Sequence, residues 1–205
     1  RSHQLLEASR KQIASLLNVK PHEIFFTSSG SESDNWAIKG TALAKKEFGN
    51  HIITSSVEHA AVSNSVRALE DLGFRVTVLP VDKNGQGDPD DLKAALDKET
   101  ILVSIMGVNN EIGTIQPIKE ISKVLEDYPN VTFHVDNVQA LGKDIWDEVF
   151  TNRVDLMSLS AHKFHAPRGV GILYKKEGKM IKPLIDGGGQ EKGLRSSTEN
   201  LPAIA

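Results

Sequence analysis

The sequence predicts an α/β fold, a mostly parallel mixed sheet with helices on both faces. Short runs rich in β-branched and aromatic residues alternate with segments of helical periodicity, which is typical of parallel strand–helix–strand units. The run at 101–105 (ILVSI) is almost wholly apolar, as expected of a strand covered on both faces. Only residues 160–169 separate the last two strands, which is too short for a parallel crossover, so the last strand should be antiparallel.

The elements follow in order along the chain. Apolar residues at helical spacing predict an amphipathic helix at 3–18, and Pro21 ends that region. Strands are expected at 24–27, 51–54, 75–79, 101–105, 131–135, 155–159 and 170–174. Helices are expected between them at 32–47, 60–72, 89–97, 117–127 and 139–149. The glycine-rich stretch at 186–200 is expected to form a loop.

Composition limits the function classes. The chain has 205 residues, of which 39% are hydrophobic and 25% charged, enough for one domain with a sizeable core. A net charge of -3 gives no electrostatic case for nucleic acid or an anionic membrane, and no apolar run approaches the ~20 residues that span a bilayer. The absence of cysteine excludes disulfides, thiolate metal sites and a cysteine nucleophile within these residues. We expect a soluble, cytoplasmic protein with no metal site.

Polar and charged residues follow several predicted strands at the edge where parallel α/β sheets place active sites. Each group has a structural explanation by itself, such as a helix cap or a turn. Lys163 is harder to explain, because an ammonium group buried without a partner in a tight connection is costly. The groups are Ser28 to Glu32, Ser55 to His59, Asn109 with Asn110, Asp136 to Gln139, and Ser160 with His162 and Lys163.

The type of chemistry follows from what these residues could hold together. Neither GxGxxG after an early strand nor GxxxxGK[ST] is present, so the sequence does not support a dinucleotide-dependent hydride transfer or a phosphoryl transfer. One lysine, one carboxylate and an anion site at a helix start match the needs of pyridoxal 5'-phosphate. The lysine would form an imine with the cofactor, and the carboxylate would keep the pyridine nitrogen protonated.

Six blocks of sequence resemble the cysteine desulfurases of the class V aminotransferase family. The blocks are FTSSGSESDNWAIKG (26–40), TSSVEHAAV (54–62), LVSIMGVNNEIGTIQPI (102–118), FHVDNVQALGK (133–143), DLMSLSAHKFHAPRGVGILY (155–174) and GGGQEKGLRSSTEN (187–200). The resemblance implies that residues 1–205 form an aspartate-aminotransferase-like large domain that binds pyridoxal phosphate. The implied reaction converts L-cysteine to L-alanine and passes the sulfur to a protein thiol.

The resemblance also implies a role for each matching residue. Lys163 would be the imine-forming lysine, and Asp136 would pair with the pyridinium nitrogen. His59 would stack on the ring and shuttle protons, while Gln139 would hydrogen-bond the phenolic oxygen. Asn110 would lie near the substrate carboxylate or the ring oxygen. The implied phosphate ligands are Gly30, Ser31, Ser160 and His162.

Thr198 resembles the residue that reaches the phosphate of the other subunit, which implies a homodimer. A sulfur-acceptor or scaffold protein is a further expected partner. The chain begins in a helical pattern and ends on an apolar stretch, so we expect an N-terminal segment and most of a smaller C-terminal domain to be absent. Because the chain has no cysteine, we expect it to be inactive as a desulfurase by itself.

Departures from the family pattern keep other functions open. Gly30 and Ser31 stand where alanine and threonine are common, and Ala166 and Ser197 stand where glycine is usual. Asn137 replaces a small residue. A selenocysteine lyase or an aminotransferase of the same family is the alternative enzyme. A non-catalytic dimerising module is disfavoured, because it would have no use for the lysine, aspartate, glutamine and histidine together.

Overall fold

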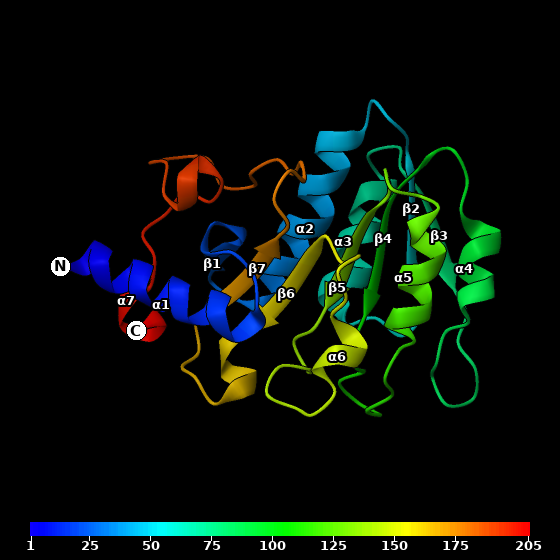
Figure 1. Ribbon diagram of the computed structural model, residues 1–205. Coiled ribbons are helices and arrows are strands. Elements are labelled where there is room, and N and C mark those ends of the chain that lie inside the picture. Colours follow the sequence, from blue (N-terminus) through cyan, green and yellow to red (C-terminus); the bar gives the residue numbers. More distant parts are fainter.

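Seven strands form one mixed sheet in the order β1-β7-β6-β5-β4-β2-β3, in a computed structural model that describes residues 1–205 (Figure 1). β7 is antiparallel to both of its neighbours, and every other pair is parallel. The predicted fold class and the antiparallel last strand are therefore confirmed. The strands are β1 Ile24–Thr27, β2 His51–Ser55, β3 Arg75–Leu79, β4 Thr100–Met106, β5 Thr132–Asp136, β6 Leu156–Ser160 and β7 Gly171–Lys175.

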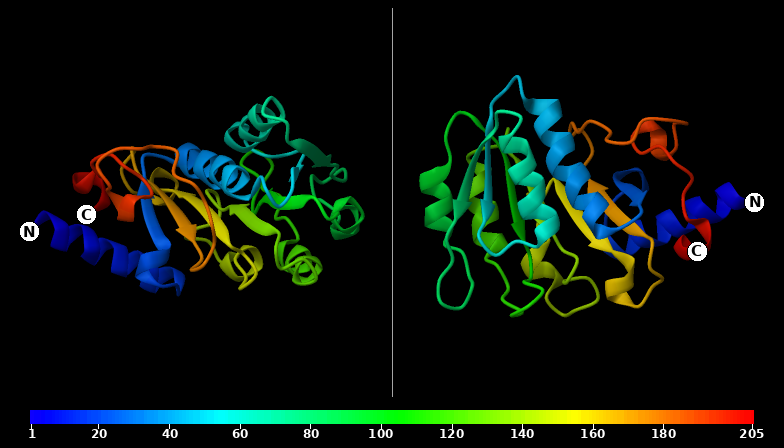
Figure 2. Two further views of the ribbon diagram at one scale, coloured as in Figure 1. Left: turned by 90° about the horizontal axis from the view of Figure 1, so that it is seen from above. Right: turned by 180° about the vertical axis from the view of Figure 1, so that it is seen from behind.

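Helices cover both faces of the sheet (Figure 2). α2 and α3 lie on one face, and α1, α4, α5 and α6 lie on the other. The short C-terminal α7 lies beside α1, so the two ends of the chain are neighbours. The helices are α1 Ser2–Leu17, α2 Gly30–Lys45, α3 Ala60–Glu70, α4 Pro89–Ala95, α5 Ile118–Glu126, α6 Trp146–Val149 and α7 Leu201–Ile204, with 3-10 turns at Pro21–Glu23, Ala161–Phe164 and Glu191–Gly193.

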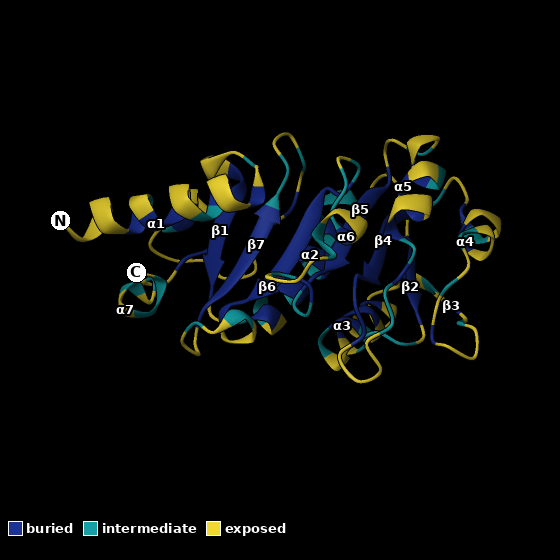
Figure 3. Ribbon diagram, turned by 60° about the horizontal axis from the view of Figure 1, so that its bottom comes forward, coloured by how far each residue is buried: buried dark blue, intermediate teal, exposed yellow.

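Burial on both faces explains the apolar strands. A core of 27 buried residues lies beneath α1, α4, α5 and α6, and a second core of 9 lies beneath α2 and α3. All seven residues of β4 are buried, with Val103 and Ile105 in the first core and Ile101 and Leu102 in the second. Figure 3 shows the central strands buried and the outer helix surfaces exposed. The free energy gained by burying apolar surface on both sides holds the layers together.

The predicted helix at 139–149 is wrong over most of its length, because only Trp146–Val149 is helical. Asp136 Oδ1 accepts a hydrogen bond from Val138 N at 3.0 Å, which starts a turn instead of a helix. Gly142 has a φ of 82°, a left-handed conformation that breaks helical geometry. The hydrogen bond of Asp136 and the left-handed Gly142 therefore produce a turn where the spacing of apolar residues had predicted a longer helix.

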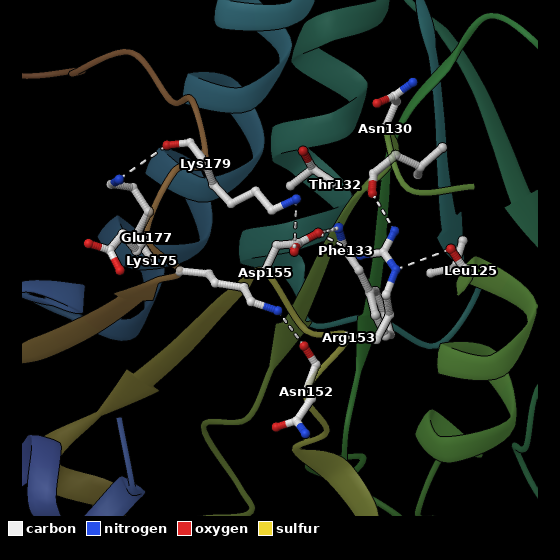
Figure 4. A network of polar contacts seen from close by, with 12 residues as sticks. Leu125, Asn130, Thr132, Phe133, Asn152, Arg153, Asp155, Lys175, Glu177 and Lys179 are labelled. Atoms are coloured by element: carbon white, nitrogen blue, oxygen red, sulfur yellow. Dashed lines mark hydrogen bonds and ion pairs between the residues drawn. The ribbon is translucent and has the colours of Figure 1, made fainter. Parts of the chain in front are cut away.

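A network of charged residues lies at the amino ends of β5 and β6, the edge of the sheet opposite the predicted site (Figure 4). Asp155 is 1% exposed and lies just before β6. Its Oδ2 accepts hydrogen bonds from Arg153 Nη1 at 2.7 Å and Phe133 N at 2.9 Å, and its Oδ1 lies 3.3 Å from Lys179 Nζ. Arg153 also donates to three backbone carbonyl groups, those of Leu125, Tyr128 and Val131.

No helix is both long enough and apolar enough to span a membrane. No group of three or more histidine, cysteine, aspartate or glutamate side chains is arranged to hold a metal ion.

Candidate active site

One cavity of about 290 Å³ opens at the carboxyl ends of the parallel strands. That volume lies near the lower end of the ~300–1,000 Å³ usual for ligand pockets. Nine of the ten predicted site residues line it, and they come from five different strand ends. These residues are Gly30, Ser31, His59, Asn110, Asp136, Gln139, Ser160, His162 and Lys163.

The start of α2 forms one wall of the cavity. Ser29 caps the helix in an extended conformation, and its Oγ accepts a hydrogen bond from Glu32 N at 3.1 Å. The Glu32 carboxylate in turn accepts from Ser28 N, so these two side chains serve the helix itself. First-turn N–H groups have no intrahelical partner, and with the helix dipole they favour an anion here. At Gly30 a Cβ atom would lie only 3.1 Å from Ser160 Cβ, so glycine keeps this wall close to the end of β6.

The end of β5 supplies the carboxylate. Asp136 is 5% exposed, lines the cavity and is held by the hydrogen bond from Val138 N. Burial raises the pKa of Asp136, while the hydrogen bond from Val138 N opposes that rise. The side chain is therefore fixed in direction by the same turn that replaced the predicted helix.

Lys163 lies on the 3-10 turn that follows β6 and is exposed, so its ammonium group pays no burial cost. The hydrogen bond from Ala161 N to Val170 O, 3.0 Å long, closes the connection behind it. His165 adopts a left-handed conformation at φ 71° and ends the turn. Lys163 and His162 both line the cavity, as Ser160 does at the end of the strand. The tight connection thus presents the lysine to the cavity.

His59 caps the start of α3, and its Nδ1 accepts a hydrogen bond from Ala61 N at 3.1 Å. Because an accepting nitrogen carries no proton, a neutral His59 has its proton on Nε2. The cap therefore fixes which nitrogen of this ring is available as a donor.

Asn110 and its neighbour Asn109 have different roles in the turn after β4. Asn109 builds the turn, since its Oδ1 accepts from Glu111 N and Ile112 N and its Nδ2 donates to Val57 O. Asn110 is exposed and faces the cavity. Only the second asparagine is free to meet a ligand.

Thr198 does not join the other nine residues. It is exposed and lies beside α1 in a separate open groove of about 730 Å³, which it shares with the segment around Gly188 and Lys192. The resemblance assigned Thr198 to the site of another subunit, so its position here does not contradict that expectation.

Sequence reasoning missed three titratable residues in the cavity wall or next to it. Asp34 lines the cavity and is 1% exposed, and it lies four residues after Gly30 on the same face of α2. Glu58 precedes His59, and burial raises the pKa of its carboxyl to about 8. His134, two residues before Asp136 on the same face of β5, has its pKa lowered to about 3 by burial. Helix and strand periodicity could have found Asp34 and His134.

Comparison with known proteins identifies the family. The model of the family described as "Aminotransferase class-V" matches residues 1–203. A "NifS/IcsS protein homolog" of Lactobacillus delbrueckii subsp. bulgaricus is 75% identical over all 205 residues, which cover 53% of its length. A "Cysteine desulfurase IscS" of Clostridium botulinum is 52% identical over 205 residues, 51% of its length.

Solved structures agree with these matches. A "NIFS-LIKE PROTEIN" has a TM-score of 0.93 at 43% identity, with 99% of this chain and 56% of that chain covered. A structure described as "SspA in complex with cysteine" has a TM-score of 0.91 at 40% identity, with 99% and 58% covered. The chain spans about half the length of the curated relatives it matches. With a family model matched over nearly its whole length, the chain belongs to the class V aminotransferase family, as its resemblance to the cysteine desulfurases led us to expect.

Proposed function

We propose that these 205 residues form the pyridoxal-phosphate-binding large domain of a cysteine desulfurase. One observation carries the proposal: a single cavity brings together a lysine, a buried carboxylate and a helix N-terminus from separate strand ends. Members of the class V aminotransferase and cysteine desulfurase families depend on pyridoxal phosphate. The proposal assigns that cofactor to this cavity.

The wall formed by α2 fits the phosphate group. The free N–H groups of the first helical turn, the hydroxyls of Ser31 and Ser160 and the ring of His162 supply hydrogen-bond donors. None of these groups except His162 can carry a charge, so backbone dipoles and hydroxyls would supply most of the binding. Gly30 would allow the phosphate to approach the backbone closely.

Asp136 fits the opposite, pyridine end of the cofactor. Its carboxylate would accept a hydrogen bond from the ring nitrogen and favour the protonated form of that nitrogen. When bound, the cofactor supplies an electron sink for a negative charge at the substrate Cα. Gln139 is half-buried beside Asp136 and would donate to the phenolic oxygen.

Lys163 would hold the cofactor covalently through its ε-amino group. His59 lines the cavity with its Nδ1 bound by Ala61 N, and its Nε2 would accept and return protons next to the ring. Asn110 at the cavity rim would orient the substrate carboxylate or the ring oxygen.

The proposed substrate is L-cysteine, and the proposed products are L-alanine and a sulfur atom carried as a persulfide on a protein thiol. High identity to proteins named cysteine desulfurase supports this substrate, as does the cysteine bound by one structural neighbour. The thiol must come from outside these residues, since the chain has no cysteine. A sulfur-acceptor or scaffold protein is the proposed partner.

We also infer a cytoplasmic homodimer. Thr198 is exposed and lines a groove separate from the cavity of its own chain, which fits a residue that reaches the phosphate of a second subunit. The cytoplasmic location is inferred from composition, namely the absence of cysteine and of long apolar runs.

The test is to trap the cofactor chemically. The protein is mixed with pyridoxal 5'-phosphate, reduced with borohydride and digested, and the labelled peptide is located by mass spectrometry. The label is expected on Lys163 and is expected to disappear in Lys163→Ala. Lys143→Ala is the matched control, because Lys143 borders an adjoining cavity. A label that stayed in Lys163→Ala and was lost in Lys143→Ala would overturn the assignment.

A further inference from the structure

Three carboxyl groups from different elements lie in the cavity wall or next to it: Asp34 and Asp136 line the cavity, and Glu58 directly precedes His59, which also lines it. Asp34 belongs to α2, Asp136 to β5 and Glu58 to the connection between β2 and α3. None of the three forms an ion pair with a lysine or arginine, and the only basic group near Asp34 is His134, at 3.5 Å. Three negative charges without a counter-charge would be costly in such a place.

His134 cannot supply the missing positive charge. Its ring is fully buried, and its Nδ1 and Nε2 lie 2.7 and 2.8 Å from the hydroxyls of Ser104 and Ser158. Burial lowers the pKa of His134 to about 3, so the ring is neutral at physiological pH. A neutral ring can offer Asp34 at most one N–H donor, at the long distance of 3.5 Å. The negative charge must therefore be reduced by protons on the carboxyl groups.

Asp34 and Asp136 line the same cavity and are 1% and 5% exposed, so their carboxyl groups share one buried wall. Two ionised carboxylates offer only acceptors, so a hydrogen bond between them requires one proton. The geometry distinguishes the two sites. Asp136 Oδ1 already accepts from Val138 N at 3.0 Å, which favours a charged oxygen there. Asp34 Oδ1 is buried and has no hydrogen-bond partner, a position that suits a neutral carboxyl far better than a carboxylate.

We propose that Asp34 is a positioning residue that keeps its proton and donates it in a hydrogen bond to Asp136, which holds Asp136 ionised and directed into the cavity. Burial and the negative charge of Asp136 both raise the pKa of Asp34, which agrees with this placement of the proton. The inference rests on the proposed function only in that the cofactor ring nitrogen would be the group that Asp136 meets.

On this proposal, Asp136 is the only one of the three carboxyl groups that carries a negative charge. Glu58 is the third carboxyl, and its Oε1 accepts from Ser55 Oγ at 2.7 Å and Met106 N at 2.9 Å. Its Oε2 is buried without a partner, which again suits a neutral group. His59 and Lys163 face the same cavity from the other sides. Asp136 is then the one carboxylate lining the cavity that can accept a hydrogen bond from the protonated ring nitrogen.

The first measurement needs no cofactor and tests the proton. If Asp34 is protonated in the folded chain and ionised in the unfolded chain, folding takes up one proton above the unfolded pKa of ~3.9. The folding equilibrium constant of the wild type should then fall about tenfold more per pH unit than that of Asp34→Asn between pH 5 and 7. Denaturant unfolding followed by circular dichroism gives both slopes. Glu58 contributes to both proteins and cancels in the comparison.

Thr41→Val is the matched control for this measurement. Thr41 is also a buried α2 side chain whose polar atom has no partner, but it does not line the cavity. Its pH slope should equal that of the wild type. Equal slopes for Asp34→Asn and the wild type would overturn the proposal, because Asp34 would then hold no proton that the unfolded chain lacks.

The second measurement tests the effect on the cofactor site. The holoprotein is prepared with pyridoxal 5'-phosphate labelled with ¹⁵N in the ring, and the ¹⁵N shift reports whether the ring nitrogen is protonated. Asp34→Ala should move the resonance toward the unprotonated value and weaken cofactor affinity about tenfold, as expected for a change of about one pKa unit at Asp136. Asp34→Asn keeps an N–H donor for Asp136 and should stay near the wild type.

The outcomes separate this inference from the proposed function. If wild-type protein binds the cofactor and Asp34→Ala shows the wild-type resonance and affinity, the positioning role is wrong and the function stands. If wild-type protein binds no cofactor, the proposed function fails, and equal pH slopes for the wild type and Asp34→Asn would still overturn the inference. Should Asp34→Ala fail to fold, the slope of Asp34→Asn remains decisive.

Discussion

Replacement of Asp155 by alanine should destabilise the protein far more than loss of a surface ion pair of equal length. The Asp155 side chain is 2% exposed and meets Arg153, Lys179 and Phe133 N. The alanine variant leaves two cations without this carboxylate and a buried N–H group without an acceptor. Breaking a buried ion pair by removing one partner costs about 3–5 kcal/mol.

The structure places the expected loss at the lower end of that range. Arg153 keeps its bonds to the carbonyls of Leu125, Tyr128 and Val131, at 3.1, 3.0 and 2.7 Å, so its guanidinium stays hydrogen-bonded. Lys179 is 30% exposed and can turn to water. We therefore expect the free energy of unfolding to fall by about 3 kcal/mol. At about 2–4 °C per kcal/mol for a chain of this size, Tm should fall by roughly 6–12 °C.

The assay is urea unfolding at neutral pH, with Glu148→Ala as the control. Glu148 pairs with Lys119 at 2.7 Å, the same distance as the Arg153–Asp155 contact, but the two side chains are 55% and 44% exposed. Exposed pairs contribute about 0–1 kcal/mol. If Asp155→Ala lost no more stability than Glu148→Ala, burial would not be what makes the Asp155 network strong, and the reasoning would be refuted.

Three further predictions concern Arg10, Glu58 and Gly171. Arg10→Ala should lower the free energy of unfolding in urea by about 3 kcal/mol, because the fully buried Glu191 carboxylate loses contacts of 2.8 and 2.7 Å, and a loss below 1 kcal/mol would contradict this. Glu58→Gln should flatten the pH dependence of stability: a carboxyl whose folded-state pKa is raised to about 8 makes the wild type lose stability as pH rises from about 4.5 to 8, and an unchanged slope would show the carboxyl to be unperturbed. Gly171→Ala should weaken pyridoxal phosphate binding in equilibrium dialysis, because the new Cβ would lie 2.3 Å from the Ser29 carbonyl and would displace the helix start, whereas wild-type affinity would mean that this loop yields freely.

The sheet was predictable from sequence because its strands are buried on both faces. Each predicted strand is present within one or two residues, and the short connection at 160–169 correctly implied the antiparallel β7. The stretch after Asp136 was not predictable from apolar spacing. There the carboxylate bonds Val138 N, and Gly142 takes a left-handed conformation, so a turn replaces most of the expected helix.

Most of the candidate site was predictable because active sites of parallel α/β sheets lie at the carboxyl ends of the strands. The residues that follow each parallel strand meet at that edge. This rule could not find Asp34, which lies one helical turn inside α2 and looks like an ordinary polar helix residue. Glu58 was not predicted as a site residue, because its neighbour His59 was the residue that received a chemical role. Helical periodicity places Asp34 on the same face as Gly30, but the buried, unpartnered oxygen atoms of Asp34 and Glu58 are seen only in the structure.

Charge, not regular secondary structure, holds the loop at 186–200 in place. Glu191 and Ser197 have positive φ values of 48° and 104°, conformations that cost free energy for residues with a Cβ. Two bidentate contacts offset that cost: Arg195 binds Glu32 at the start of α2, and Arg10 of α1 binds Glu191. The loop is thereby tied to the same helix start that would bind the phosphate. These contacts already order the loop within one chain. A contact from the loop to a second subunit would therefore cost little further conformational entropy. Under that condition a single exposed residue such as Thr198 can contribute to binding.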